Sequence, residues 1–544
     1  MTFTARSIDA LKAYLRTAAV IDDKVTQTRE SAPATPNTPG RIVQRSTESE
    51  APRESSGAPL DGRTLTAAFL DQGILCTVLG STQVLTDKKK ITALLRSDIL
   101  IVDWKLGDDG TITTRFIHRC AAMHPHALHM ICIYTSENDF GAIRQKLEDT
   151  DDTLRNIPDL EYIPAFREIQ DTPDAYAFGS IYVLIVKKNV EEAKLPGHLL
   201  EAFAPLVGGL LRNAVFHSIG AIRNNTHALL DRFHSDLDPA FVTHRVYSNP
   251  CEDTEQHIIP LICSEIGNIL YQEKISNWLS KKIIWEWTNK NNLHDCYKNF
   301  LDSIYGNSGT IESVKEFHIK SAVRHILSGI SKEYETYNYP HRKKVLQIIQ
   351  DLKNSTKSAN LKKSGMTRFW GAETPSLADV KLSMLMSCVH FYGNTPPIMQ
   401  SGTIIKEIGS DNYYGCIQPP CDCLRIEQEG RPFLFTPLQE VSIDSSFDIS
   451  FLFDSTDTPY YLSKHKKAYR VKSIHFIPST AGENIYAEPS NQGYIFKDAD
   501  DKEYVFCMQL NEIHALRLIQ TYSSDLARIG LMESDWQRRI ASKK

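Results

Sequence analysis

The sequence lacks the short motifs by which many enzymes are recognised. No Walker loop, no GxGxxG turn followed by a helix, no GxSxG elbow and no HExxH pair occurs among its 544 residues. Glycine-rich ATP-binding boxes are absent, and no basic second helix indicates a DNA-reading helix-turn-helix. We therefore expect a protein that is not an enzyme of these classes.

An excess of charge of one sign and a long uncharged apolar run are also missing. The formal net charge is only −5, so no global basic field predicts a nucleic-acid partner. The most hydrophobic window, residues 199–216, contains Glu201, Pro205 and Arg212, which is typical of a buried helix pair or a kinked helix. With no secretory leader pattern and eleven scattered cysteines, we expect a cytoplasmic protein without a membrane partner.

Three of the cysteines lie close together without the spacing of a usual zinc site. Cys416, Cys421 and Cys423 follow a C-x4-C-x-C pattern, and no second pair accompanies them. Structural zinc sites normally combine two such pairs. Packing within a strand-turn-strand unit is the favoured interpretation, and a metal site is the alternative.

Changes in sequence texture predict four regions. Apolar runs alternate with amphipathic runs over residues 1–189, apart from a Pro- and Ser-rich stretch at 26–62, which we expect to be a disordered insertion. Residues 190–395 have helical periodicity. Short alternating runs over 396–510 predict a small antiparallel β-barrel, and residues 511–544 predict a C-terminal helix.

The first region has the rhythm of a doubly wound α/β domain with five parallel strands. Runs rich in Ile and Val, separated by predicted helices, are typical of a parallel sheet covered on both faces. The predicted strands are residues 18–21, 74–79, 98–103, 129–135 and 181–186. Ligands of such sheets bind at the carboxyl ends of the strands.

Polar side chains follow four of these predicted strands. Asp22 and Asp23 end the first, Asp103 ends the third, Thr135 ends the fourth and Lys187 follows the fifth. Since the carboxyl ends of parallel strands meet at one edge, these groups can converge. Three carboxylates in a small cleft repel one another unless a cation lies among them, and Mg²⁺ prefers such oxygen ligands.

These strand ends resemble the receiver domains of two-component signalling over roughly residues 14–189. The parts that carry the resemblance are the acid pair, the turn "DWKLGDDG", "IYTS" and "VKK". The resemblance implies that Asp103 is the phosphoacceptor, with Mg²⁺ held by Asp22, Asp23, Asp103 and the main-chain oxygen of Lys105. It also implies that Thr135 bonds the phosphoryl group.

The lysine that pairs with the phosphoryl charge is open between two neighbours. Lys187 and Lys188 are adjacent, and the receiver pattern has a proline after its lysine. Lys187 directly follows the last apolar residue of the predicted strand, so we favour Lys187 over Lys188.

The resemblance implies a phosphoacceptor that receives its phosphoryl group from a partner histidine kinase. Because no motif of an effector activity is recognised after the receiver-like region, we expect the protein to serve as a relay or a phosphate buffer. A divergent N-terminal receiver followed by a long tail resembles the receiver-only component of Detocs-type phage defence, where a receiver-bearing effector would be a further partner. The C-terminal region resembles an SH3-like barrel. The alternative is a receiver-gated effector whose C-terminal domain acts on nucleic acid or another partner.

Overall fold

The structure is a computed structural model that divides into two compact units, residues 1–290 and 291–544. It describes residues 2–24, 60–80, 85, 87–107, 109–123, 127–149, 166–169, 174–248, 253–290, 292–305, 314–328, 342–354, 364–391, 395–443, 445–453, 457–465 and 470–526. The predicted insertion at 26–62 lies mostly outside these residues. Its last three residues are described, and Asp61 caps the helix that begins at Gly62. None of the described helices is long and apolar enough to span a membrane.

The first unit is built on a seven-stranded sheet with the order β2-β1-β3-β4-β7-β6-β5. The five parallel strands coincide with the predicted ones, and β6 and β5 add an antiparallel edge beside β7. In chain order the strands are β1 (Thr17–Ile21), β2 (Leu75–Leu79), β3 (Ile99–Asp103), β4 (His129–Thr135), β5 (Phe166–Glu168), β6 (Ala175–Phe178) and β7 (Ile181–Lys187). The sheet of the predicted α/β domain is therefore confirmed, with two additional strands.

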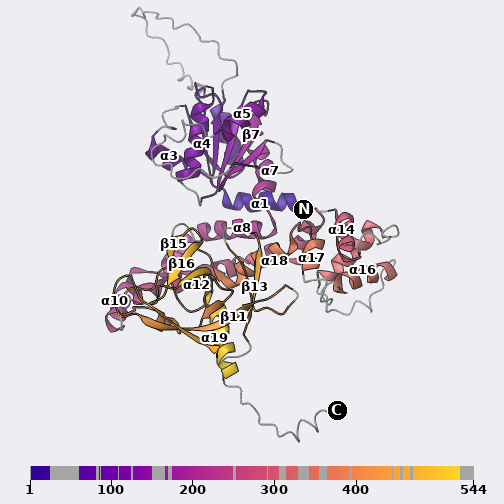
Figure 1. Ribbon diagram of the computed structural model, residues 1–544. Helices are drawn as coiled ribbons and strands as arrows, with labels where there is room; N and C mark the ends of the chain where they lie inside the picture. Colours follow the sequence, from indigo (N-terminus) through magenta and orange to yellow (C-terminus); the bar gives the residue numbers. More distant parts are fainter. Residues whose placement is uncertain are drawn as a thin grey trace, which may run out of the picture. The chain divides into compact units, whose positions relative to one another are not determined.

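Helices cover both faces of this sheet (Figure 1). Alternate residues of β1, β3, β4 and β7 enter the two cores, as expected for strands buried on both faces. One core holds α1 (Phe3–Tyr14), α2 (Gly62–Asp71) and α7 (Leu195–Val207). The other holds α3 (Lys88–Leu94), α4 (Thr111–Met123) and α5 (Phe140–Glu148).

The hydrophobic window at 199–216 forms the predicted helix pair. Helix α7 ends at Val207, and α8 (Leu210–Asn224) begins after Gly208 and Gly209. Helix α8 packs against α1, and Gly220 allows this because a Cβ atom there would collide with the Ala13 carbonyl. The rest of the unit comprises α9 (Thr226–Arg232), η2 (Ser235–Leu237), α10 (Asp238–Tyr247), α11 (Asp253–Gln256), α12 (Ile258–Gln272), η3 (Ile275–Leu279) and α13 (Lys281–Thr288).

The second unit contains a helical part followed by an antiparallel sheet. The helices are α14 (Leu293–Tyr305), α15 (Glu316–Ile326), α16 (Arg342–Asn354), α17 (Ser364–Phe369) and α18 (Pro375–Ser387). Tyr297, Phe300 and Phe369 form the aromatic centre of this part, and the Tyr297 hydroxyl donates to Asp351 over 2.8 Å. The predicted change from helices to strands is therefore present.

The sheet of the second unit has ten strands, in the order β12-β13-β11-β10-β9-β17-β16-β15, with β14 paired to β11 and β8 to β17. The strands are β8 (Cys388–Val389), β9 (Thr403–Glu407), β10 (Tyr413–Cys416), β11 (Arg431–Glu440), β12 (Ile449–Leu452), β13 (Pro459–Lys464), β14 (Lys472–Phe476), β15 (Glu488–Ser490), β16 (Gly493–Lys497) and β17 (Glu503–Leu510). Helix α19 (Glu512–Leu526) follows, and residues 527–544 of the predicted C-terminal helix lie outside the described part of the chain. An antiparallel C-terminal sheet is confirmed; its SH3-like character stays a prediction.

Cys416 and Cys423 are buried in the core of this sheet, whereas Cys421 is exposed. Among the described residues, the acidic cluster of the first unit is the one group of potential ligands close enough to hold a metal. The burial of Cys416 and Cys423 fits packing between strands, and the metal alternative stays a prediction.

Candidate functional site

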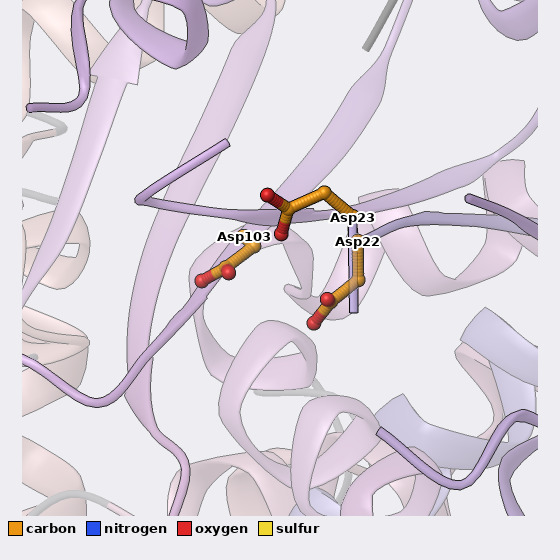
Figure 2. Close-up of side chains that lie close together, drawn as sticks. All are labelled: Asp22, Asp23 and Asp103. Carbon is orange, nitrogen blue, oxygen red and sulfur yellow. The ribbon is translucent and has the colours of Figure 1, made fainter. Parts of the chain in front are cut away.

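The candidate site lies at the carboxyl edge of the parallel strands in the first unit. Asp22 and Asp23 follow β1, and Asp103 is the last residue of the neighbouring strand β3. Figure 2 shows the three aspartate side chains gathered at this edge. Carboxylate oxygens of all three lie within 4.8 Å of one another, as the sequence predicts.

Burial differs among the three carboxylates. Asp22 and Asp103 are buried, with 2% and 6% of their surface exposed, whereas Asp23 is exposed. The Asp22 carboxylate also accepts a hydrogen bond from the Lys24 backbone amide over 2.8 Å, which fixes the turn that leaves β1. The cluster therefore has a closed side, formed by Asp22 and Asp103, and an open side at Asp23.

Lys188 supplies the positive charge on the closed side. Its ammonium lies 2.7 Å from Asp22 Oδ2 and 3.2 Å from Asp103 Oδ2. Both carboxylates need such a partner, because an isolated buried charge is strongly unfavourable. Lys188 therefore joins the two buried acids, one from each strand.

The structure brings Lys188 to the acidic cluster, and not Lys187, which the sequence favoured; which lysine pairs with a phosphoryl group stays a prediction. Lys187 is exposed, and its ammonium donates to the Asn138 side chain in the loop before α5. Successive side chains of a strand point to opposite faces of the sheet, which explains why only one of the two neighbouring lysines lies at the carboxylates. Lys188 lies on the same face of β7 as Leu184 and Val186. These two residues enter the core that also holds Val20 and Ile101, which lie two residues before Asp22 and Asp103. Lys187 lies on the opposite face, with Val183 and Ile185.

The surroundings raise the pKa of Asp103 to about 6. Burial is the largest cause, because it disfavours the ionised form. The Lys188 ammonium opposes this effect, while the charges of Asp22 and Asp23 add to it. Contacts with Asp22 and Asp103 outweigh burial at Lys188 and raise the pKa of its ammonium. At neutral pH the site therefore holds a positively charged lysine and a mostly ionised Asp103.

Thr135 and Lys105 flank the cluster. Thr135 ends β4, one residue beyond Tyr134, which is in register with Asp103. Its buried hydroxyl accepts a hydrogen bond from the Glu137 amide over 3.1 Å. The Lys105 side chain is turned to Glu137, with an Nζ–Oε1 distance of 2.5 Å. These contacts connect the loop after β3 to the loop after β4; the metal-binding role of the Lys105 main-chain oxygen stays a prediction.

The turn after Asp103 is held by residues that the sequence reading did not single out. The Thr113 hydroxyl donates to the Asp103 carbonyl over 2.8 Å and to the Trp104 carbonyl over 3.3 Å. Gly110 has a φ of +96°, and a Cβ atom there would collide with the buried Trp104 ring. The glycine in "DDG" could have indicated this turn in the sequence, since a backbone with positive φ favours a residue without a side chain.

The donor set of the cluster fits a hard divalent cation. Three carboxylates offer oxygen ligands only, two of them are buried on neighbouring strands, and Lys188 offsets part of their charge at short distance. Mg²⁺ accepts one or two carboxylates together with waters, which suits a cluster with one open side. Asp22, Asp23 and Asp103 are therefore suitable ligands for this ion.

Comparison with known proteins assigns this part of the chain to a class. Residues 14–162 match the family model described as the response receiver domain. The N-terminal part of the chain is therefore a receiver domain, as its resemblance implied. The match spans Asp22, Asp23, Asp103 and Thr135 and ends before Lys187 and Lys188. Comparisons with curated proteins and with solved structures give no match.

Proposed function

We propose that the protein is a phosphoacceptor that takes a phosphoryl group on Asp103 from a partner histidine kinase. The observation that carries this proposal is the buried arrangement of Asp103 and Asp22 around the Lys188 ammonium. A receiver domain supports a phosphodonor partner of this kind. The partner's identity belongs to the proposal.

The chemistry requires one bond to form and one to break. A carboxylate oxygen of Asp103 attacks phosphorus, the P–N bond of the donor phosphohistidine breaks, and the imidazole leaves with its electron pair and takes a proton. Asp103 needs no general base, because its pKa of about 6 leaves it mostly ionised at neutral pH. The product is an aspartyl phosphate.

Neighbouring groups can offset the charge of the incoming phosphoryl oxygens. The Lys188 ammonium lies beside the attacking carboxylate, and the Thr135 hydroxyl stands at the end of the adjacent strand. Such preorganised charges and donors are the main source of rate enhancement in phosphoryl transfer. Mg²⁺, held by Asp22, Asp23, Asp103 and the Lys105 main-chain oxygen, would neutralise further negative charge at this point.

We further propose that the protein works as a relay or phosphate buffer in the cytoplasm and has no catalytic turnover of its own. Residues 190–544 would then contact partners, among them a receiver-bearing effector. The analogy with Detocs-type phage defence supports an antiviral role, in which uptake of stray phosphoryl groups restrains that effector.

Phosphorylation by a small phosphodonor tests the proposal without the partner kinase. Incubation with acetyl phosphate and Mg²⁺ is expected to add one phosphoryl group to the full-length protein, detected by intact mass. Asp103→Ala should abolish this addition. Asp109→Ala is the matched control, because Asp109 lies in the same turn but is exposed and paired with Lys146. Equal labelling of both variants would refute Asp103 as the acceptor.

The alternative of a receiver-gated effector has less support from the described residues. A basic groove on the C-terminal sheet would favour nucleic acid, but Lys472 and Lys502 both pair with the buried Glu407. This carboxylate offsets one of the two positive charges within the sheet. Growth arrest on expression of the chain alone, without a kinase, would favour the effector instead.

A further inference from the structure

The first unit contains three helices that bury almost none of their own side chains. We call α9, α10 and α12, together with the short η2 between α9 and α10, the helical arm; α10 and α12 are labelled in Figure 1. No residue of α9 or α10 is buried, and on α12 only Ile269 is. Helix α12 packs along α8 and α9, so the arm is a single layer of helices. A single layer gives an amphipathic helix nothing to bury its apolar stripe against.

The uncovered surface of the arm is strongly apolar. Ten of its large hydrophobic side chains are exposed: Leu230, Leu237, Phe241, Val242, Val246, Tyr247, Ile259, Leu261, Ile262 and Tyr271. Helix α12 has the sequence "IIPLICSEIGNILYQ", in which Glu265 is the one charged residue. Exposed apolar side chains in this number are typical of an interaction site.

A groove runs through this surface between α10 and α12. It has a volume of about 820 Å³, and its apolar lining is formed by Phe233, Leu237, Phe241, Ile258 and Leu261. Such a groove can receive large apolar side chains from a facing helix.

The charges at the rim of the groove are paired within the chain. Arg232 lies 3.7 Å from Glu265, and Arg245 lies 3.0 Å from Glu255. Each pair joins one basic and one acidic residue. The lining also contains Asp238, His234 and His244, so the groove carries only a small net charge and does not attract a strongly acidic or basic partner. A nearly neutral apolar face is complementary to another face of the same composition.

We propose that the arm is a homodimerisation surface and that its occupant is the arm of a second copy of this chain. Two single-layer arms facing each other across a two-fold axis form a helical bundle with a shared core, in which each groove accepts side chains of the partner. A stable interface buries about 800 Å² on each partner, and ten large exposed apolar side chains are on that scale.

Sedimentation of the full-length protein tests the proposal. The wild type is expected to sediment as a dimer at micromolar concentration. Val242→Glu with Leu261→Glu should weaken dimerisation at least about a hundredfold, because each places a charge in the shared core. Both residues are 53–58% exposed within one chain, so the fold of the monomer should persist, as circular dichroism would verify. Leu75→Glu is the matched control, being similarly exposed on β2.

A second measurement identifies what covers the arm. Cys263 is exposed on α12 and serves as a built-in probe for maleimide labelling, read by peptide mass. Its labelling is expected to slow as the protein concentration rises and to be fast in the double variant. A wild type that remains monomeric at about 100 µM would overturn the proposal. So would a dimer that survives the double variant, or a monomer in which Cys263 is protected at every concentration.

Discussion

The Lys188 ammonium lies 2.7 Å from Asp22 Oδ2, although 165 residues separate the two in the sequence. The same ammonium is 3.2 Å from Asp103, so one cation serves the ends of β1 and β3 from its position after β7. This contact determines how the acidic edge responds to substitution, pH and Mg²⁺.

Removing Lys188 should destabilise the receiver domain and slow phosphorylation. Lys188→Ala leaves two buried carboxylates without their cation, which we expect to lower the free energy of unfolding by about 3 kcal/mol at pH 8. Hydrogen exchange of β3 and β4 amides measures this locally. Lys187→Ala is the control and should change it by less than about 0.5 kcal/mol, because the Lys187 ammonium donates to Asn138 from an exposed position. Equal effects of the two variants would contradict the assignment.

The raised pKa of Asp103 predicts a stability that depends on pH in the metal-free protein. Since the pKa is about 6 in the fold and 3.8 in the unfolded chain, ionised Asp103 costs stability at high pH. Its favourable contribution is complete below pH 3.8 and is lost as pH rises to 6. Asp103→Asn should therefore stabilise the domain at pH 8, by at most about 3 kcal/mol, with no gain near pH 4. Hydrogen exchange at the two pH values, with EDTA present, distinguishes this from a pH-independent effect.

The same pKa predicts how labelling by acetyl phosphate depends on pH in the absence of added metal. The nucleophile is the ionised carboxylate, so the initial rate should fall about tenfold for each pH unit below 6. Intact mass spectrometry over time gives these rates. A rate that stays constant from pH 7 to pH 4 would show that Asp103 is not the attacking group.

Mg²⁺ should stabilise the receiver domain through the acidic cluster. At a concentration one hundred times the dissociation constant, the ion is expected to add about 2.7 kcal/mol. Asp23→Asn should weaken this effect without unfolding the domain, because Asp23 is exposed. Asp109→Asn, an exposed substitution in the turn after β3, should leave it intact. Identical Mg²⁺ responses of the two variants would place the ion elsewhere.

The turn after Asp103 offers a matched pair of glycine substitutions. Gly110→Ala should destabilise the domain by clearly more than Gly107→Ala, because both residues have positive φ but only Gly110 faces the Trp104 ring. Backbone strain alone accounts for about 1 kcal/mol at Gly107. Exchange rates of the β3 amides report the difference, and comparable values would mean that Trp104 yields to the added methyl group.

The strands and the acidic cluster were predictable because their patterns are local. A run such as "ILIVD" shows in five residues both a buried strand and the group at its end. The sequence around Lys187 and Lys188 did not contain the information needed to choose between them. The choice depends on which face each residue continues, and both faces of β7 are buried, so hydrophobicity does not distinguish them.

Two other features depended on distant contacts. The strands β5 and β6 have three and four residues, too short to give a clear alternation, and they are defined by pairing beside β7. Thr113 is ten residues from Asp103 in sequence, and its role is apparent only where α4 returns to the end of β3.

The β6–β5 extension changes how β7 can respond to events at the acidic edge. With β4 on one side and β6 on the other, β7 is an interior strand held by two ladders of hydrogen bonds. Shifting its backbone would break both ladders at once, whereas turning the Lys188 side chain breaks neither. The Lys188 side chain can therefore change its rotamer while the backbone of β7 stays in place. We expect a new charge on Asp103 to change the rotamer populations of Lys188 first.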